Sequence, residues 1–187
     1  MQIAVILGSQ RKNGMSNEIE NKINQYENNN YVFIRMAETI IDGCIACQNC
    51  ANSGKCEQIN NLNDMFAKTF EILKKSDVIL IITPIYAPYP SRLIALIEKL
   101  FSISWFGYEF GKIQRPLLNK KVGIVCYGSS KIEDDKHLKI IFQKIVSNEY
   151  SFTEVSYDYI NNESEPNKKY KNIIEYIDNI MIKISEL

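Results

Sequence analysis

The sequence has little of what several common functions require. It has no excess charge of either sign, because 22 Lys and Arg balance 22 Asp and Glu, and no basic stripe suited to a phosphate backbone occurs. Nucleic acid is therefore not an expected partner. The single histidine, His137, stands in a charged stretch and is expected to be a solvated helix residue rather than a ligand or a catalyst.

Long apolar runs are also absent. The longest, Val78 to Thr83, is far shorter than the roughly 20 residues that cross a bilayer, so no membrane-spanning helix and no membrane partner are expected. The N-terminus lacks the positive region and cleavage site of a secretory signal, which predicts a cytoplasmic protein. No internal repeat or domain linker occurs, so a single domain over residues 1–187 is expected.

Short apolar runs alternate with segments of helical periodicity. Continuous apolar strands are typical of a parallel sheet that is covered on both faces. The alternation predicts an α/β fold, a doubly wound parallel sheet of five strands with helices on both faces. The expected strands are Ile3 to Leu7, Tyr31 to Ile34, Val78 to Thr83, Val122 to Tyr127 and Phe152 to Tyr157. The expected helices carry Ile19 to Tyr26, Met65 to Leu73, Leu93 to Phe101, Leu138 to Val146 and Tyr170 to Ile184.

Four of the five cysteines crowd into the segment 44–56, as Cys44, Cys47, Cys50 and Cys56. Three cysteines at two-residue intervals and a fourth after a short spacer are typical of a loop that wraps a [4Fe–4S] cluster. Zinc is the second interpretation, because a structural zinc site usually joins two separated Cys-x2-Cys pairs. Disulfides come third, since they need an oxidising compartment. A redox-active thiol pair and inert cysteines remain alternatives, and Cys126 is expected in the core.

A second long connection, Ser102 to Pro116, carries an aromatic cluster. Long irregular connections in compact domains tend to be functional. The sequence predicts a loop here. The loop either packs on itself or against a second subunit, or it covers the open face of a bound planar ring. Its aromatic residues are Trp105, Phe106, Tyr108 and Phe110.

The segment after the first strand has the donors that a phosphate needs. Hydroxyls at Ser9 and Ser16, a cation at Arg11 and the backbone amides of a helix N-terminus combine hydrogen bonds, dipole and counter-charge. The segment matches neither the Walker A pattern nor Gly-x-Gly-x-x-Gly. The alternative is a polar turn with a helix cap.

Two further loops are expected beside the phosphate segment. They follow the third strand, at Thr83 to Pro90, and the fourth, at Cys126 to Ser130. In the flavodoxin-like strand order 2-1-3-4-5, all three loops rim one crevice. One end of that crevice suits a phosphate and the other suits a planar ring, so the sequence predicts a bound FMN.

Three motifs in this order resemble a known family. They are Gly-Ser-x-Arg-Lys near the start, Cys-x2-Cys-x2-Cys-x5-Cys, and Pro-Ile-Tyr followed by Tyr-Pro-x-x-Leu-x-Ala-Leu. Over about the first 130 residues the chain resembles the iron–sulfur flavoproteins of the NADPH-dependent FMN reductase superfamily. The chain departs from the family pattern at Gln10, which replaces the usual proline, at Met15, where relatives often have Asn, and at Glu57, where the bacterial ferredoxin run has proline.

The resemblance implies a flavodoxin-like fold, FMN in the crevice, a [4Fe–4S] cluster on the four cysteines, and a homodimer or homotetramer. The phosphate would be held by Ser9, Arg11, Gly14, Met15 and Ser16. The isoalloxazine would lie against Pro84, Ile85, Tyr86, Ala87, Tyr127, Gly128 and Ser129.

The predicted function is that of an FMN-dependent oxidoreductase, in which FMN does the chemistry and no side chain acts as a conventional catalyst. NAD(P)H or the cluster would supply the electrons, and a quinone or a free flavin is the kind of small molecule expected to accept them. One alternative is a non-catalytic electron carrier linked to ferredoxin. Another is a sensor module whose cysteine segment responds to oxidant or metal.

Overall fold

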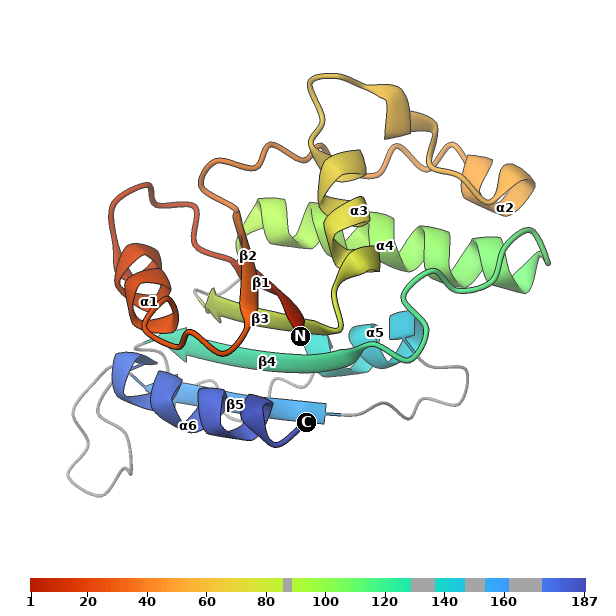
Figure 1. The fold of residues 1–187 in the computed structure, drawn as a ribbon. Helices are drawn as coiled ribbons and strands as arrows, with labels where there is room; N and C mark the ends of the chain where they lie inside the picture. Colours follow the sequence, from red (N-terminus) through yellow and green to blue (C-terminus); the bar gives the residue numbers. More distant parts are fainter. Residues whose placement is uncertain (86–88, 129–136, 147–153, 162–172) are drawn as a thin grey trace.

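A twisted parallel sheet forms the centre of the computed structural model, which describes residues 1–85, 89–128, 137–146, 154–161 and 173–187 (Figure 1). The strands lie in the order β2-β1-β3-β4, and β5 pairs in parallel with the outer side of β4. The predicted α/β fold with the order 2-1-3-4 is therefore confirmed. The strands are β1 (Gln2–Leu7), β2 (Asn30–Arg35), β3 (Val78–Pro84), β4 (Lys121–Gly128) and β5 (Glu154–Asn161).

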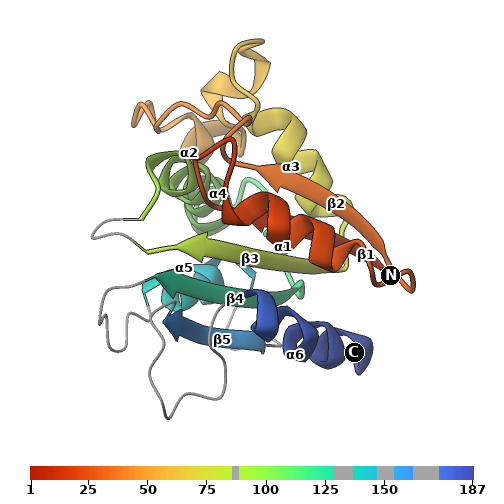
Figure 2. The same cartoon turned by 90° about the vertical axis from the view of Figure 1, so that its left-hand side faces the viewer.

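Helices cover both faces of the sheet, as the continuous apolar strands predicted; every residue of β3, for example, is buried. Helices α1 and α6 pack on one face, in front of the sheet in Figure 2, and α3, α4 and α5 pack on the other. None of the helices in the described parts of the chain is long and apolar enough to span a membrane. The helices that cover the sheet are α1 (Met15–Ile23), α3 (Phe66–Lys75), α4 (Ser91–Glu109), α5 (His137–Val146) and α6 (Ile173–Ser185).

Two separate cores result, because successive side chains of a strand point to opposite faces. Ile79 and Ile81 of β3 face α3, α4 and α5, whereas Leu80 and Ile82 face α1 and α6. Cys126 is buried in the first of these cores, as predicted.

The carboxyl ends of β1, β3 and β4 lie level with one another. Gly8 follows β1 and donates its N–H to the carbonyl of Ile82 at 2.8 Å, beside Thr83. The next strand continues the edge, since Pro84 is in register with Tyr127 and the N–H of Ile85 donates to the Tyr127 carbonyl at 2.8 Å. The strand ends that were predicted to rim one crevice are thus brought to one edge of the sheet.

The aromatic connection is mostly helical, which corrects the prediction of an irregular loop over Ser102 to Pro116. Helix α4 continues to Glu109 and ends where Gly111 takes a φ of 64°. The helix persists because its buried stripe does not stop at Phe101: Ile103, Ser104 and Gly107 are also buried.

The cysteine segment contains the short helix α2 (Asn49–Ser53), and a 3-10 helix at Glu57–Asn60 follows it directly. Helix α2 lies beside the C-terminal half of α4 (Figure 1), where a Cβ on Gly107 would come within 3.5 Å of the Cys50 carbonyl oxygen. The small residue in α4 therefore allows the cysteine segment to approach the helix closely.

Gly54 anchors this segment, and replacing it by alanine is expected to destabilise the protein by about 2–5 kcal/mol. Its φ of 73° is in the left-handed region, which costs a residue with a Cβ about 1–2 kcal/mol. The new Cβ would also lie 2.5 Å from Ile113 Cγ2, and overpacking adds about 1–3 kcal/mol. The change in unfolding free energy is measured by urea denaturation.

Gly111→Ala is the matched control, because Gly111 also has a positive φ, of 64°, but open space around its Cα. It should show only the backbone cost of about 1–2 kcal/mol. Equal losses for the two variants would contradict the close contact between Gly54 and Ile113.

Candidate functional site

The segment between β1 and α1 brings the predicted phosphate donors together. The hydroxyl-bearing residues Ser9 and Ser16 are both buried, at 6% and 5% exposure. Helix α1 begins at Met15, directly after Gly14, which provides no capping side chain. The first N–H groups of a helix have no acceptor within the regular helical pattern. At α1 the N–H of Asn17 donates to the Gly14 carbonyl oxygen at 2.9 Å, so Met15 and Ser16 carry the N–H groups that would face an anion.

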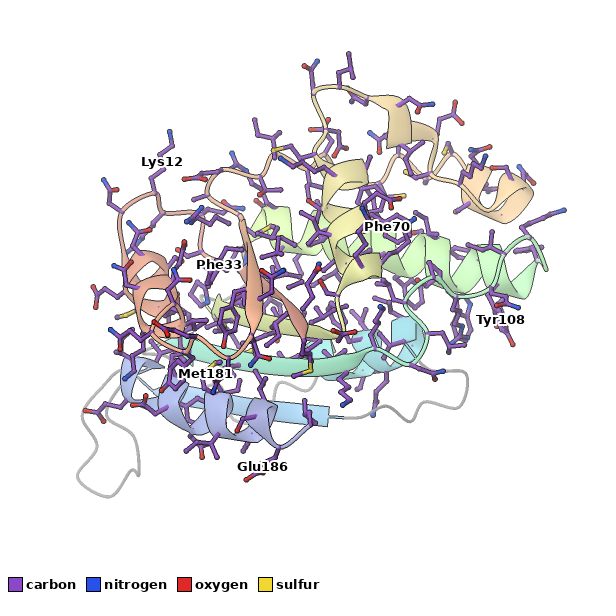
Figure 3. All side chains as sticks on the ribbon, viewed as in Figure 1. Lys12, Phe33, Phe70, Tyr108, Met181 and Glu186 are labelled. Atoms are coloured by element: carbon purple, nitrogen blue, oxygen red, sulfur yellow. The ribbon has the colours of Figure 1, made fainter. Side chains whose placement is uncertain are left out.

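Arg11 and Lys12 add positive charge to this segment, and both side chains are exposed. The N–H of Arg11 donates to Ser9 Oγ at 3.3 Å, which holds the turn between them. Lys12 points outward from the tip of the segment, away from the sheet (Figure 3). Hydroxyls, a helix N-terminus and a guanidinium make a donor set whose chemistry fits a phosphate dianion.

The other predicted contacts lie at the same edge of the sheet. Pro84 and Gly128 end β3 and β4, next to Ile85 and Tyr127. The side chains of Ile85 and Tyr127 are 4% and 5% exposed and pack into opposite cores. These two residues can therefore present mainly backbone to a ligand. The predicted contacts Tyr86, Ala87 and Ser129 lie outside the described residues.

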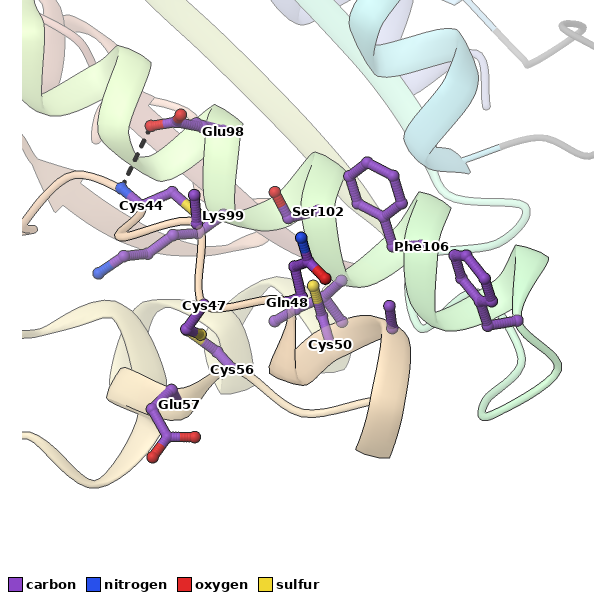
Figure 4. A pocket seen from close by; sticks show the side chains of 14 residues that line it. Cys44, Cys47, Gln48, Cys50, Cys56, Glu57, Glu98, Lys99, Ser102 and Phe106 are labelled. Atoms are coloured by element: carbon purple, nitrogen blue, oxygen red, sulfur yellow. Dashed lines mark hydrogen bonds between the residues drawn. The ribbon is translucent and has the colours of Figure 1, made fainter.

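All four clustered cysteines line one pocket of about 490 Å³ between the cysteine segment and α4 (Figure 4). The backbone N–H of Cys44 donates to a carboxylate oxygen of Glu98 at 3.2 Å, which attaches the start of the segment to α4. Helix α4 and the residue that follows it form one wall of the pocket, with Glu98, Lys99, Ser102, Ile103 and Phe106 on the helix and Phe110 directly after it.

The four cysteines of this pocket form no disulfide. Burial raises the pKa of Cys50 and of Cys56, and the neighbouring thiols Cys44 and Cys47 raise both pKa values further. The positive charge of Lys99 lowers the pKa of Cys56 and so opposes part of this rise. Within the described ranges, no three Cys, His, Asp or Glu side chains are grouped as a metal ion requires. The four cysteines that were predicted as metal ligands thus line one pocket, but their thiols do not surround a common position that a metal ion could occupy.

A buried ion pair behind this pocket was missed by the sequence analysis. Lys99 of α4 pairs with Asp64, and both side chains are fully buried. The second carboxylate oxygen of Asp64 accepts the N–H of Phe66 at 2.8 Å, at the start of α3. The Lys99 ammonium also lies 5.4 Å from the centre of the Phe66 ring. The available signal was a lysine on the apolar stripe of a helix, between Leu96 and Ile103.

Comparison with known proteins identifies the family. The model of the family described as NADPH-dependent FMN reductase matches residues 1–153. No curated protein matches the sequence. Among solved structures, Smu.1420 from Streptococcus mutans UA159 is similar, with a TM-score of 0.66 at 14% identity, over 99% of this chain and 100% of that one.

Two further structures share the fold. The NAD(P)H:quinone oxidoreductase from Methanothermobacter marburgensis has a TM-score of 0.59 at 12% identity, over 98% of this chain and 95% of that one. The general stress protein 14 from Treponema denticola, in complex with FMN, has a TM-score of 0.54 at 8% identity, over 99% and 96%. At these identities the likeness shows a shared flavodoxin-like fold, whereas the family model covers most of the sequence. The chain belongs to the NADPH-dependent FMN reductase family and is an oxidoreductase of that family.

Proposed function

We propose that this chain binds FMN at the carboxyl edge of β1, β3 and β4 and transfers electrons from NAD(P)H to a small flat acceptor such as a quinone or a free flavin. The observation that carries the proposal is the level arrangement of the three strand ends. Because the three strands end at the same edge of the sheet, the donors around Ser9 and Ser16 lie at the same edge as the backbone of Pro84 and Tyr127. In open α/β sheets, ligands bind outside the carboxyl ends of the strands in this way.

The residues of the chain bind and orient the cofactor, and bound FMN supplies the hydride and electron chemistry. Ser9, Ser16 and the first amides of α1 would hold the phosphate, with Arg11 as its counter-charge. The rigid strand ends at Pro84 and Gly128 would position the ring. Both the FMN-bound relative and the quinone oxidoreductase of the same fold support this assignment.

The test is an anaerobic titration of the FMN-loaded protein with NADPH and, separately, with NADH. We expect the absorbance of the oxidised flavin to bleach, and we expect a quinone to restore it at a rate that sustains turnover. Bound flavin that neither nicotinamide reduces, but that reduced ferredoxin does, would overturn the enzyme proposal in favour of an electron carrier.

A second proposal concerns the cysteine segment, for which a metal, with a [4Fe–4S] cluster preferred over zinc, is the candidate ligand. It rests on four thiols that line one pocket, which is the donor set that either centre uses. In the described structure the thiols are not gathered, so the segment would have to close around the metal. Because the pKa values of Cys50 and Cys56 are raised, metal must displace protons from these thiols.

Anaerobic reconstitution with iron and sulfide should therefore give about four irons and four sulfides per chain. Uptake should strengthen as the pH rises, because a higher pH favours the thiolates that bind metal. Cys47→Ala should abolish uptake, whereas Cys126→Ala, which removes a buried core thiol outside the pocket, should leave the iron content unchanged. One tightly held zinc per chain with no iron uptake would exclude the cluster.

A further inference from the structure

The pocket between the cysteine segment and α4 has the size and the walls of a small-molecule site. Its volume of about 490 Å³ lies within the range of roughly 300–1,000 Å³ that such sites occupy. Cys50 and Cys56 pack against the core, and a free thiol in such a place behaves as a small hydrophobic group. The other apolar side chains of the pocket are Ala46, Ala51, Ile103, Phe106 and Phe110.

Two uncharged polar side chains reach this pocket from opposite walls. Gln48, the N-cap residue of α2, extends toward α4, where Ser102 lies (Figure 4). Within the described parts of the chain, neither the Gln48 carboxamide nor the Ser102 hydroxyl makes a hydrogen bond. Both groups can donate to a carbonyl oxygen. The pocket therefore combines apolar walls with two convergent donors, which is typical of a binding site.

The charges at the pocket favour an uncharged ligand. Lys99 lines the pocket, but its ammonium is paired with Asp64, and both side chains are fully buried. The carboxylates of Glu57 and Glu98 also line the pocket, and both residues are exposed. An anionic ligand would face these negative charges, which disfavours its binding. FMN and nicotinamide dinucleotides carry phosphates, so a neutral molecule fits this pocket better than either of them.

The backbone of the pocket is strained where it carries Gln48. Gln48 and Ala46 have positive φ values of 60° and 50°, although neither residue is a glycine. Such a backbone is unfavourable for a residue with a Cβ, and it is found preferentially at functional sites. Glycine would adopt the same backbone without strain, so packing alone does not explain a glutamine at position 48.

We propose that this pocket, in the metal-free protein, binds an uncharged fused-ring aromatic ketone, the chemical class that includes quinones. The ring packs on Phe106, and Gln48 and Ser102 donate hydrogen bonds to a carbonyl oxygen of the ligand. None of the described residues proposed to hold FMN lines this pocket, so the site is separate from the FMN site and does not depend on it. Because the cysteine segment would have to close around a metal, the ring and the metal exclude one another.

Quenching of Trp105 fluorescence measures binding. Trp105 is the only tryptophan of the chain and directly precedes Phe106 on α4. The probe is hydroxymethylanthraquinone, which is uncharged, quenches a tryptophan beside it, and lacks the ring positions that thiols attack. We expect saturable quenching of the chelator-treated protein, with the same dissociation constant with and without FMN. Anthraquinone monosulfonate has the same ring with a negative charge and should bind about tenfold or more weakly.

Phe106→Ala and Tyr108→Ala are a matched pair of variants. The two side chains are 43% and 38% exposed on the same helix, but Tyr108 does not line the pocket and instead lies against Arg115. Phe106→Ala should weaken probe binding by about three- to tenfold, because an aromatic contact is lost. Tyr108→Ala should leave the dissociation constant unchanged. Equal effects of the two variants would overturn the proposed site.

Gln48→Gly separates a role in binding from a role in structure. Glycine accepts a φ of 60° without strain, so the midpoint of urea denaturation should not fall. Loss of the carboxamide donor should weaken probe binding by about two- to tenfold. A lower midpoint with unchanged probe affinity would show that Gln48 serves the structure of the segment, and the inference would be wrong.

The outcomes also distinguish this inference from the proposed function. Quenching that does not saturate, or equal affinities for the neutral and the anionic probe, would overturn the ring site and leave FMN binding standing. Saturable quenching by a protein that binds no FMN would support the ring site and overturn the proposed function.

Discussion

Arg11→Ala is expected to weaken FMN binding by about tenfold or more while leaving riboflavin binding unchanged. The Arg11 guanidinium is the counter-charge of the proposed phosphate site, whose other proposed donors, the hydroxyls of Ser9 and Ser16 and the first amides of α1, are neutral. Hydrogen bonds to charged groups contribute about 1.5–3 kcal/mol, and about 1.4 kcal/mol corresponds to a tenfold change in affinity. The measurement is fluorescence titration of the apoprotein with each flavin.

Lys12→Ala is the matched control, because it removes the same charge from the next residue, whose side chain points away from the sheet (Figure 3). Its effect on FMN affinity should be small and should decrease as salt is added, as expected for a screened surface charge. Equal losses for the two variants would mean that only the net charge of the segment matters. An unchanged affinity in Arg11→Ala would show that the segment is a turn and not a phosphate site.

Lys99→Met is expected to destabilise the protein by about 3–5 kcal/mol, the largest effect on stability that we predict. The substitution leaves the Asp64 carboxylate fully buried without its cation, and removing one partner of a buried pair has about this cost. The effect should appear as a lower midpoint in urea denaturation with an unchanged slope.

The double variant Lys99→Met with Asp64→Asn tests the cause of this loss. Asn retains an oxygen that can accept the N–H of Phe66, and neither side chain is then charged. Replacing a whole buried pair by neutral groups is often close to neutral, so the double variant should recover most of the stability.

Lys74→Met provides the surface comparison. Lys74 pairs with Glu71 on α3, where both side chains are substantially exposed, at 36% and 55%. Such pairs contribute about 0–1 kcal/mol. If Lys99→Met cost no more than Lys74→Met, the burial of the Lys99–Asp64 pair would not make it more important for stability than a surface pair.

The strands could be predicted from the sequence, because a strand buried on both faces must be apolar throughout, and the order 2-1-3-4 was expected from the flavodoxin-like fold that the chain resembles. β3 satisfies this at every position. The candidate phosphate donors could be selected from the sequence, since Ser9, Arg11 and Ser16 lie within eight residues between a strand and a helix. The cysteine spacing identified a shared site for four thiols, and the structure places all four around one pocket.

The length of α4 was misjudged because aromatic residues and a glycine after Phe101 resemble a loop. The burial of Ile103, Ser104 and Gly107 becomes clear only in the folded protein, where α4 packs against α5 and against α2 of the cysteine segment. Whether a helix continues depends on what its apolar stripe packs against, and that partner can be distant in sequence.

The sequence by itself determined the fold class, the family and the residue types at the candidate site, since these depend on local hydrophobic periodicity and on motifs within short segments. Tertiary structure alone decided which distant residues meet. Lys99 pairs with Asp64, 35 residues away, and the Gln10 carboxamide hydrogen-bonds with Ser91 Oγ at the start of α4, 81 residues away. It also decided that the four cysteines share a pocket without forming a ligand set. Contacts of this kind depend on the relative positions of packed elements, which local sequence patterns do not encode.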